Sequence, residues 1–178
     1  MSYLGLDLSL SSTGFFLLKD DGTNKNCTIV TKPEEYPNLV RRVEKIADTI
    51  LDLIKGEDVK LTLMENFFIG QHAHAVIGLA ALGTMVRYKL SKNGYSYVSA
   101  EPSKIKKFET GKGMAKKDVM LKYVFKNHSF DTNSNDIADA CAAAYLCKSY
   151  AEYLMGNKDF MKYQLEVLKT MAKIEEPY

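Results

Sequence analysis

The sequence has few cysteines and no long apolar run, and both absences narrow the class of protein. Its 178 residues include three cysteines, Cys27, Cys141 and Cys147, an odd number without a Cys-x-x-Cys pair. This pattern argues against a disulfide framework and against a zinc site, and it favours reduced cysteines in the core. No apolar stretch approaches the roughly 20 residues that a membrane span needs, so we expect no membrane contact.

The first residues, Met-Ser-Tyr-Leu-Gly-Leu-Asp, reach a charged side chain too early for a secretion signal. We therefore expect an intracellular, cytoplasmic protein. The hydrophobic share of 46% and charged share of 26% are ordinary for a soluble globular protein, and the length suits one well-formed core. No repeat, low-complexity tract or linker divides the sequence, so residues 1–178 are expected to form a single domain.

Positive charge is concentrated in one segment. Between residues 104 and 126 eight lysines stand against Glu109 and Asp118, a local net charge of +6 in a chain whose net charge is +2. Lysine clusters attract the phosphate backbone electrostatically and carry no sequence preference of their own. The segment is a candidate nucleic-acid surface, and a merely solvated lysine-rich loop is the alternative that charge leaves open.

Hydrophobic patterning predicts an α/β fold whose mixed sheet begins with an antiparallel meander. The predicted order is three strands, a helix, a strand, a helix, a strand and then helices. The strands are expected over residues 3–8, 14–19, 27–31, 60–65 and 95–99, and the helices over 39–56, 74–90, 115–125, 134–154 and 158–173. The helix over 74–90 is rich in small residues and is a candidate packing or dimer face, and the last helix is expected to be a C-terminal extension. The order resembles the ribonuclease H-like arrangement, a five-stranded mixed sheet flanked by helices.

Four carboxylates fall where predicted strands end or a predicted helix begins. Asp7 ends or nearly ends one apolar strand and Glu65 ends another, where an ionised group is costly unless it is paired or bound to a cation. Asp136 and Asp139 share one face of a first helical turn, although acids are favoured there by the helix dipole alone. Together the four would form a hard-oxygen site suited to Mg²⁺ or Mn²⁺. Two such ions can activate water for phosphodiester hydrolysis.

Four segments resemble, in order, those of the RuvC family of Holliday-junction resolvases. The first, Gly5-Leu6-Asp7-Leu8-Ser9-Leu10-Ser11-Ser12-Thr13-Gly14, is also similar to the opening of sugar kinases and actin-like ATPases. The others, residues 64–68, 105–119 and 136–140, follow at the family's spacing, so the chain is identified as a member of the RuvC family. The family usually has Pro-Gly after the first aspartate, where this chain has Leu8-Ser9. This departure changes the following hairpin and suggests a phage-encoded protein acting in a bacterial host cell.

The resemblance implies a structure-selective, metal-dependent endonuclease that resolves Holliday junctions, or related three-way junctions, by paired symmetric nicks. It implies a homodimer, 5′-phosphate and 3′-hydroxyl ends, and two Mg²⁺ ions per site, replaceable by Mn²⁺. The implied catalytic metal ligands are Asp7, Glu65, Asp136 and Asp139, with Lys117 as a catalytic lysine. The implied DNA-binding residues are Phe68, Lys104, Lys106, Lys107, Lys112, Lys116 and Lys117, of which Lys106 and Lys117 match the family best.

Alternatives remain for the role of Phe68 and for the function. In the family, an aromatic residue three positions after the catalytic glutamate wedges into the open junction. Phe68 stands at that position and is the candidate wedge, but it could also be a core residue at the strand end. An actin-like ATPase would need a second subdomain, for which 178 residues leave little room. A junction-binding scaffold without cleavage, or a related nuclease acting on RNA, would also suit a lysine-rich surface.

Overall fold

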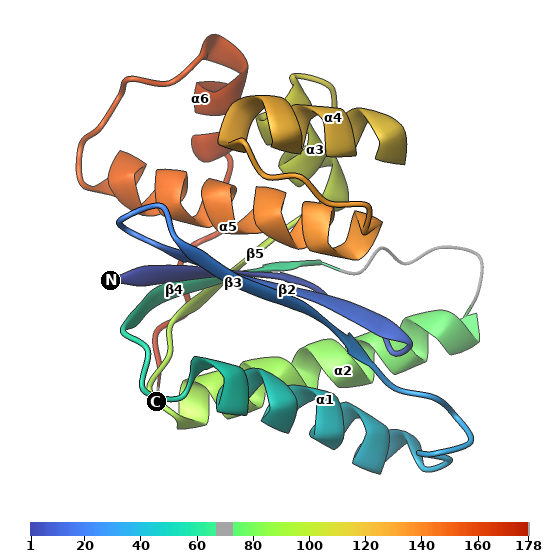
Figure 1. Ribbon diagram of the computed structural model, residues 1–178. Helices are drawn as coiled ribbons and strands as arrows, with labels where there is room; N and C mark the ends of the chain where they lie inside the picture. The colour runs from blue at the N-terminus through green and yellow to red at the C-terminus, as the bar shows by residue number, and fades with distance from the viewer. Residues whose placement is uncertain (67–72, 178) are drawn as a thin grey trace.

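The computed structural model describes residues 1–66 and 73–177, in which a five-stranded sheet lies between two layers of helices (Figure 1). The strand order is β3-β2-β1-β4-β5. The β1–β2 and β2–β3 pairs are antiparallel, and the β1–β4 and β4–β5 pairs are parallel, which confirms the predicted mixed sheet. The strands are β1 Ser2–Asp7, β2 Ser12–Lys19, β3 Asn24–Val30, β4 Val59–Glu65 and β5 Tyr97–Ala100.

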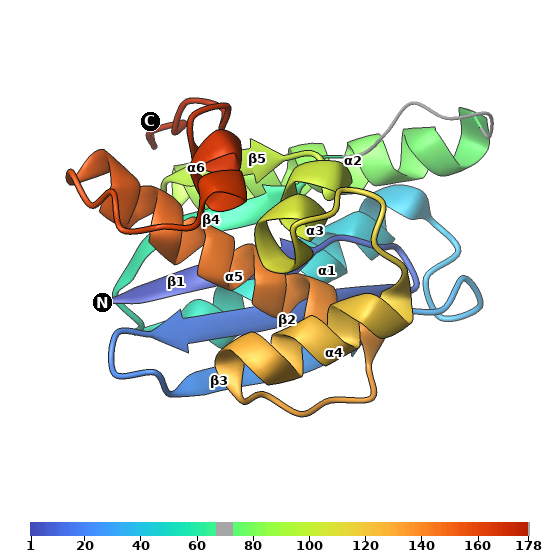
Figure 2. The same ribbon diagram turned by 90° about the horizontal axis from the view of Figure 1, so that it is seen from above.

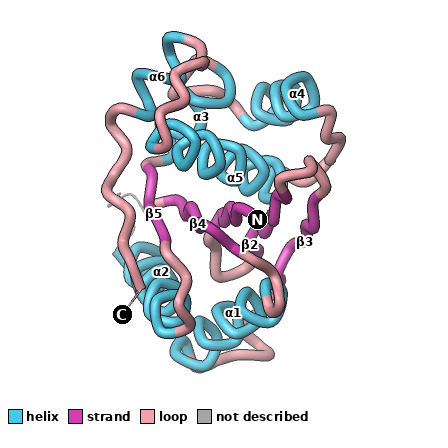
Figure 3. Tube along the Cα trace, turned by 90° about the vertical axis from the view of Figure 1, so that its left-hand side faces the viewer, coloured by secondary structure: helices cyan, strands magenta, loops and turns pink. Residues whose placement is uncertain are grey.

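The helices divide between the two faces of the sheet (Figures 1 and 3). One face is covered by α1 (Leu39–Ile54) and α2 (Ala73–Lys92), and the other by α3 (Pro102–Thr110), α4 (Lys117–His128), α5 (Asn135–Leu154) and α6 (Lys162–Leu168). Figure 2 shows α5 running over the strands, and Figure 1 shows α3, α4 and α6 beyond α5, farther from the sheet. Within the described residues no helix is both long and apolar enough to cross a membrane.

The alternation of side chains along β1 and β4 builds a separate core on each face. Leu4 and Leu6 join the buried cluster beneath α1 and α2, whereas Tyr3, Leu61 and Leu63 join the cluster that contains α5. Because every second residue of a strand faces the same way, the last residues of β1 and β4 also fall on the α5 face.

The backbone of α5 lies directly against β1 and β2. A Cβ added to Gly5 would stand 2.1 Å from the carbonyl oxygen of Ala140 and 2.3 Å from the amide nitrogen of Ala144. One added to Gly14 would stand 2.0 Å from the carbonyl oxygen of Asp136. Only glycine fits at these two strand positions. The two glycines therefore allow the backbone of α5 to lie directly on the sheet.

Hydroxyl groups and an arginine hold the hairpin between β1 and β2, where the family's Pro-Gly is missing. The Thr13 hydroxyl donates to the Ser9 carbonyl at 2.6 Å, and the Ser9 amide donates to Thr13 Oγ1 at 3.1 Å. Arg42 of α1, 9% exposed, donates to the carbonyl oxygens of Leu10 and Thr31 at 2.9 and 2.8 Å. The hairpin is therefore anchored to both the sheet and α1.

Two parts of the chain differ from the sequence prediction. No helix was predicted over α3, although Pro102 at its start and Gly111 at its end, with φ of +80°, are usual boundary residues. The predicted helix over 158–173 is wrong in extent, because α6 covers only Lys162–Leu168. Beyond it the backbone of Glu175 exchanges two hydrogen bonds with Tyr97, at 2.8 and 3.1 Å, which extends the pairing of β5 instead of continuing a helix. The single-domain organisation stays a prediction.

Replacing Gly5 with alanine should force α5 away from β1. Overpacking of this kind costs about 3 kcal/mol of unfolding free energy. Gly22→Ala is the matched control, because Gly22 has a φ of +85° but open space around it, and the backbone strain there costs about 1–2 kcal/mol. Urea denaturation of both variants measures the difference, and equal losses would contradict a tight α5–β1 contact.

Candidate active site

The first two carboxylates stand on neighbouring strands at the same end of the sheet. Asp7 is the last residue of β1 and Glu65 the last residue of β4. These strands are parallel, and Leu6 pairs with Met64 in the residue before each carboxylate. Both side chains are only partly exposed and lie on the face that α5 covers.

The other two carboxylates occupy the first turn of α5. Ser134 caps this helix, because its hydroxyl oxygen accepts the Ile137 amide hydrogen at 3.3 Å, and the chain therefore turns into the helix just before Asp136. The contact between Gly14 and the Asp136 carbonyl then holds that first turn against β2. The structure thus brings Asp136 and Asp139 to the strand end that carries Asp7.

The four carboxylates share one electrostatic environment. Burial raises the pKa of Asp7 to about 8, with further contributions from the negative charges of Glu65, Asp139 and Asp136. Burial and Asp139 raise the pKa of Glu65 to about 7, and burial followed by the charge of Asp136 raises the pKa of Asp139. A site that resists holding its own negative charge is suited to a positively charged ligand.

The donor set fits a hard divalent cation. Within the described residues no group of three or more acidic, histidine or cysteine side chains is arranged to hold a metal ion. Binding of a cation would therefore require these carboxylate side chains to change rotamer. Carboxylate oxygens are the protein ligands that Mg²⁺ and Mn²⁺ prefer, and a cation among them would offset the repulsion that raises their pKa values.

Two lysines act on these carboxylates from different helices. Lys106 of α3 opposes the rise in the pKa values of Glu65 and Asp139. Lys117, at the start of α4, opposes the rise for Asp7 and Asp139. The structure therefore brings the two lysines that match the family best to the candidate site.

The other lysines that were predicted to contact DNA have different neighbours. The Lys104 ammonium donates to the Thr170 carbonyl at 2.7 Å and pairs with Glu101 at 2.9 Å, and Lys107 pairs with Glu166 of α6 at 2.8 Å. These two side chains contact the C-terminal part of the chain, not the carboxylates. Lys112 and Lys116 are exposed near the start of α4, and Phe68 lies outside the described residues.

Sequence reasoning missed Ser12, the first residue of β2. Its hydroxyl donates a short hydrogen bond to Oδ2 of Asp136. A hydroxyl group in this position orients the carboxylate and leaves its other oxygen for a ligand, which is the usual role of an outer-sphere partner. The serine-rich turn offered no spacing signal that would have singled out this residue.

It also missed a buried network that joins the two lysine-bearing helices. Glu109 of α3, 1% exposed, accepts from the Asn127 side-chain amide and contacts His128 Nε2, each at 3.0 Å. The His128 ring stacks on Tyr145 of α5, with ring centroids 3.5 Å apart. Phe108, Glu109 and Thr110 are all buried, so the end of α3 lies in the core although its earlier lysines stay partly exposed to solvent. The network fixes α3 and α4, and hence their lysines, relative to α5.

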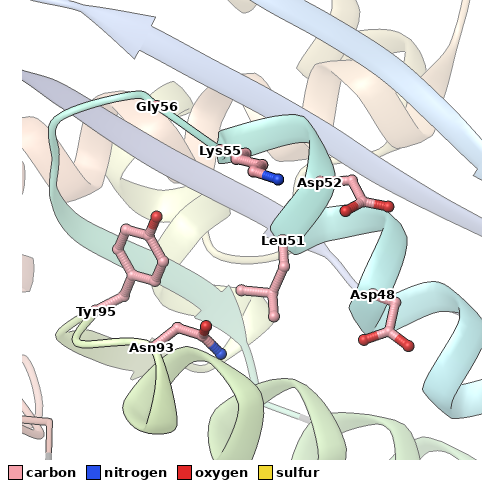
Figure 4. Close-up of a pocket in the computed structure, with 7 residues that line it drawn as sticks. All are labelled: Asp48, Leu51, Asp52, Lys55, Gly56, Asn93 and Tyr95. Atoms are coloured by element: carbon pink, nitrogen blue, oxygen red, sulfur yellow. The ribbon is translucent and has the colours of Figure 1, made fainter.

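A hollow of about 510 Å³ lies away from the carboxylates (Figure 4). It is formed by the end of α1 and the chain before β5, whereas Glu65 is at the opposite end of β4. Asp48, one of its acids, is already paired with Lys89 of α2. The residues that line it are Asp48, Leu51, Asp52, Lys55, Gly56, Asn93 and Tyr95.

Comparison with known proteins decides the family. The family model described as crossover junction endodeoxyribonuclease RuvC matches residues 3–147. The chain belongs to the RuvC family. Similar curated members are the RuvC of Synechococcus sp. (strain WH7803), 32% identical over 149 residues, and that of Ehrlichia chaffeensis, 29% identical over 156 residues. The first match covers 81% of this chain and 96% of that protein, and the second 85% and 98%.

Solved RuvC structures share the fold. Thermus thermophilus RuvC superposes with a TM-score of 0.71 at 19% identity, covering 86% of this chain and 96% of that one. The same enzyme in complex with a Holliday-junction substrate also gives a TM-score of 0.71, at 17% identity, covering 88% and 96%. The predicted RuvC membership and ribonuclease H-like fold are confirmed, and phage origin stays a prediction.

The raised carboxylate pKa values predict an unusual pH dependence of stability. An acid whose folded pKa exceeds its ordinary value contributes stability that is fully present below that ordinary value, near 4, and is lost as pH rises through the folded pKa. In EDTA the melting temperature of the wild type should therefore fall between about pH 4 and pH 8, and that of Asp7→Asn should fall less.

Adding Mg²⁺ should restore the wild-type melting temperature at high pH more than that of Asp7→Asn, because a cation binds the folded state preferentially. Asp52→Asn, at an exposed position of α1, serves as the control. Thermal unfolding followed by circular dichroism measures these shifts. Parallel pH profiles for the wild type and Asp7→Asn would contradict the raised pKa of Asp7.

Proposed function

We propose that this protein resolves Holliday junctions and related branched DNA as a divalent-metal-dependent endonuclease. The observation that carries the proposal is the convergence of Asp7, Glu65, Asp136 and Asp139 with two lysines at one end of the sheet. Membership of the crossover junction endodeoxyribonuclease family supplies the substrate class.

The residues of the site have distinct roles in this reaction. The four carboxylates would hold two Mg²⁺ ions, or Mn²⁺ in their place, and Ser12 would orient Asp136 through its hydroxyl. When bound, the ions supply activation of the attacking water and stabilisation of the leaving oxygen. Lys117 and Lys106 bring positive charge to the phosphate on which negative charge develops. Hydrolysis would leave 5′-phosphate and 3′-hydroxyl ends.

Binding to the DNA backbone would come from the lysines on the outside of the site. Lys112 and Lys116 are exposed and flank the entrance to α4, next to Lys117. Lys104 and Lys107 could join them only by leaving their acidic partners, Glu101 and Glu166. Phosphate contacts of this kind position the duplex and make binding salt-dependent. The wedge role of Phe68 and the bacterial cytoplasm as location stay predictions.

Substitution of one metal ligand tests the reaction. Glu65→Gln keeps the size of the side chain but removes a negative charge, and it should reduce junction cleavage by more than the roughly 10–100-fold that loss of an outer-sphere partner costs. A labelled synthetic four-way junction, incubated with Mg²⁺ or with EDTA beside a linear duplex, reports the nicks.

Paired nicks from the wild type with Mg²⁺ alone would agree with the proposal. Glu35→Gln, at an exposed position before α1, is the matched control and should cleave as the wild type does. Junction binding without any nick would instead identify a scaffold, and near-normal cleavage by Glu65→Gln would remove this residue from the site.

We also propose a homodimer, because two symmetric nicks require two sites and a two-fold dimer supplies them. An apolar hollow of about 510 Å³ between α1 and α2 suits a second copy of the chain. Large apolar side chains around this hollow are exposed to solvent, with exposed fractions of 63% for Val40 and 49% for Tyr88. The residues that line it are Leu39, Val40, Val43, Ala80, Ala81, Thr84, Met85 and Tyr88.

A charge placed in this hollow should break the dimer. Val40→Glu would bury an unpaired carboxylate against the second copy, so sedimentation equilibrium should show mostly monomer at concentrations where the wild type is dimeric. Val30→Glu is the control, because Val30 is 61% exposed and follows Ile29 of the core beneath α1 and α2, so strand alternation places the Val30 side chain on the opposite face of the sheet. A monomeric wild type, or dissociation by Val30→Glu alone, would overturn this interface.

A further inference from the structure

One buried acid, Glu109 near the end of α3, is not among the four carboxylates of the candidate site. Its side chain is 1% exposed, accepts a hydrogen bond from the Asn127 side-chain amide and contacts His128 Nε2, each at 3.0 Å. The same amide group also donates to the Glu109 carbonyl oxygen at 3.0 Å. Apolar side chains that fill the same space often stabilise a fold more than a buried ionic pair does. The presence of this acid therefore points to a role other than stability.

Four helices meet around the Glu109 side chain. The last residues of α4 contact it directly, and the His128 ring stacks on Tyr145 of α5 with an angle of 10° between the ring planes. Burial raises the pKa of the Tyr163 phenol of α6, and the charge of Glu109 raises it further. Glu109 thus lies where α4, α5 and α6 all reach the end of α3.

Each lysine of the candidate site shares a helix face with one member of this pair. Lys117 is the first residue of α4 and His128 the last. The eleven residues between these positions correspond to about three turns, so both side chains lie on the same side of α4, roughly 16 Å apart along its axis. Lys106 precedes Glu109 by three residues, which makes the two side chains neighbours on one side of α3.

A helix that is held at one side chain cannot turn about its own axis. The Glu109–His128 contact therefore fixes the direction in which both lysines point. Lys106 acts on the charges of Glu65 and Asp139, and Lys117 acts on that of Asp139. Rotation of either helix would carry its lysine away from these acids.

We propose that the Glu109–His128 pair locks the rotation of α3 and α4 and thereby aims Lys106 and Lys117 at the phosphodiester that is cut. The proposal rests on the nuclease function and deepens it, because it assigns two positioning residues to the same site. Loss of the pair should slow cutting without weakening junction binding, since a misdirected positive charge is missed mainly in the transition state.

Substitution of the buried acid tests the lock. Glu109→Leu removes the charge and both contacts but fills the space with an apolar side chain. In single-turnover cleavage of a four-way junction with Mg²⁺ and saturating protein, well below the melting temperature of each variant, the rate should fall by up to about 100-fold. The dissociation constant of the junction in EDTA should stay unchanged. Glu109→Gln keeps the shape and can still accept from Asn127, so it should retain most of the rate.

Two further variants separate the lock from other contacts of α3. His128→Phe keeps a ring to stack on Tyr145 but removes the contact with Glu109, so it should slow cutting as Glu109→Leu does. Glu166→Leu is the matched control, because this acid of α6 also contacts α3, through Lys107 at 2.8 Å, but is 50% exposed. It should cut at the wild-type rate under the same saturating conditions.

Double-mutant cycles give a measurement that a purely structural role would not change. Lys106→Ala and Lys117→Ala should each slow the wild type strongly and slow Glu109→Leu much less, because the lysines are already misdirected there. Equal slowing in both backgrounds, or wild-type rates in both Glu109→Leu and His128→Phe, would overturn the proposal.

Failure of the lock and failure of the nuclease function give different results. A wild type that binds junctions but never cuts would contradict the nuclease function, and this inference would fall with it. A wild type that cuts no faster than Glu109→Leu would retain the nuclease and contradict the lock alone.

Discussion

The contact between the backbone of α5 and the strands β1 and β2 is the constraint on which the site depends. Gly5 and Gly14 leave no space for a side chain beneath the helix, and the buried alanines of α5 lie against them. This contact sets the height and register of the first turn of α5, which carries Asp136 and Asp139. Without it the two helix carboxylates would not meet the two that end the strands.

The same contact creates an electrostatic cost that function explains. Close packing withdraws Asp7 and Glu65 from solvent and sets them near Asp139, so their pKa values rise to about 8 and about 7. A fold selected for stability alone would place apolar residues there. Lys106 and Lys117 offset part of the charge, and the Glu109 network holds the helices that carry them. A divalent cation would offset the rest.

Much of this arrangement follows from the sequence because strand alternation is a local property. The apolar runs before Asp7 and Glu65 predicted both strands and their ends, and Ser134 marked the start of α5. Pairings between distant segments were beyond such patterns. Nothing local showed that Ser12 would contact Asp136, or that Glu109 would be buried against His128. Charge alone did not separate neighbouring lysines either: Lys107 contacts Glu166 of α6, whereas Lys106, which matched the family better, acts on the carboxylates.

We infer that the packing of α5 on the sheet assembles one cation site from four carboxylates. A crystal structure with Mn²⁺, located by its anomalous scattering, tests this most directly. We expect two ions roughly 3.5–4 Å apart, ligated by Asp7, Glu65, Asp136 and Asp139. Mn²⁺ bound only to other acids, with these four side chains unligated, would contradict it.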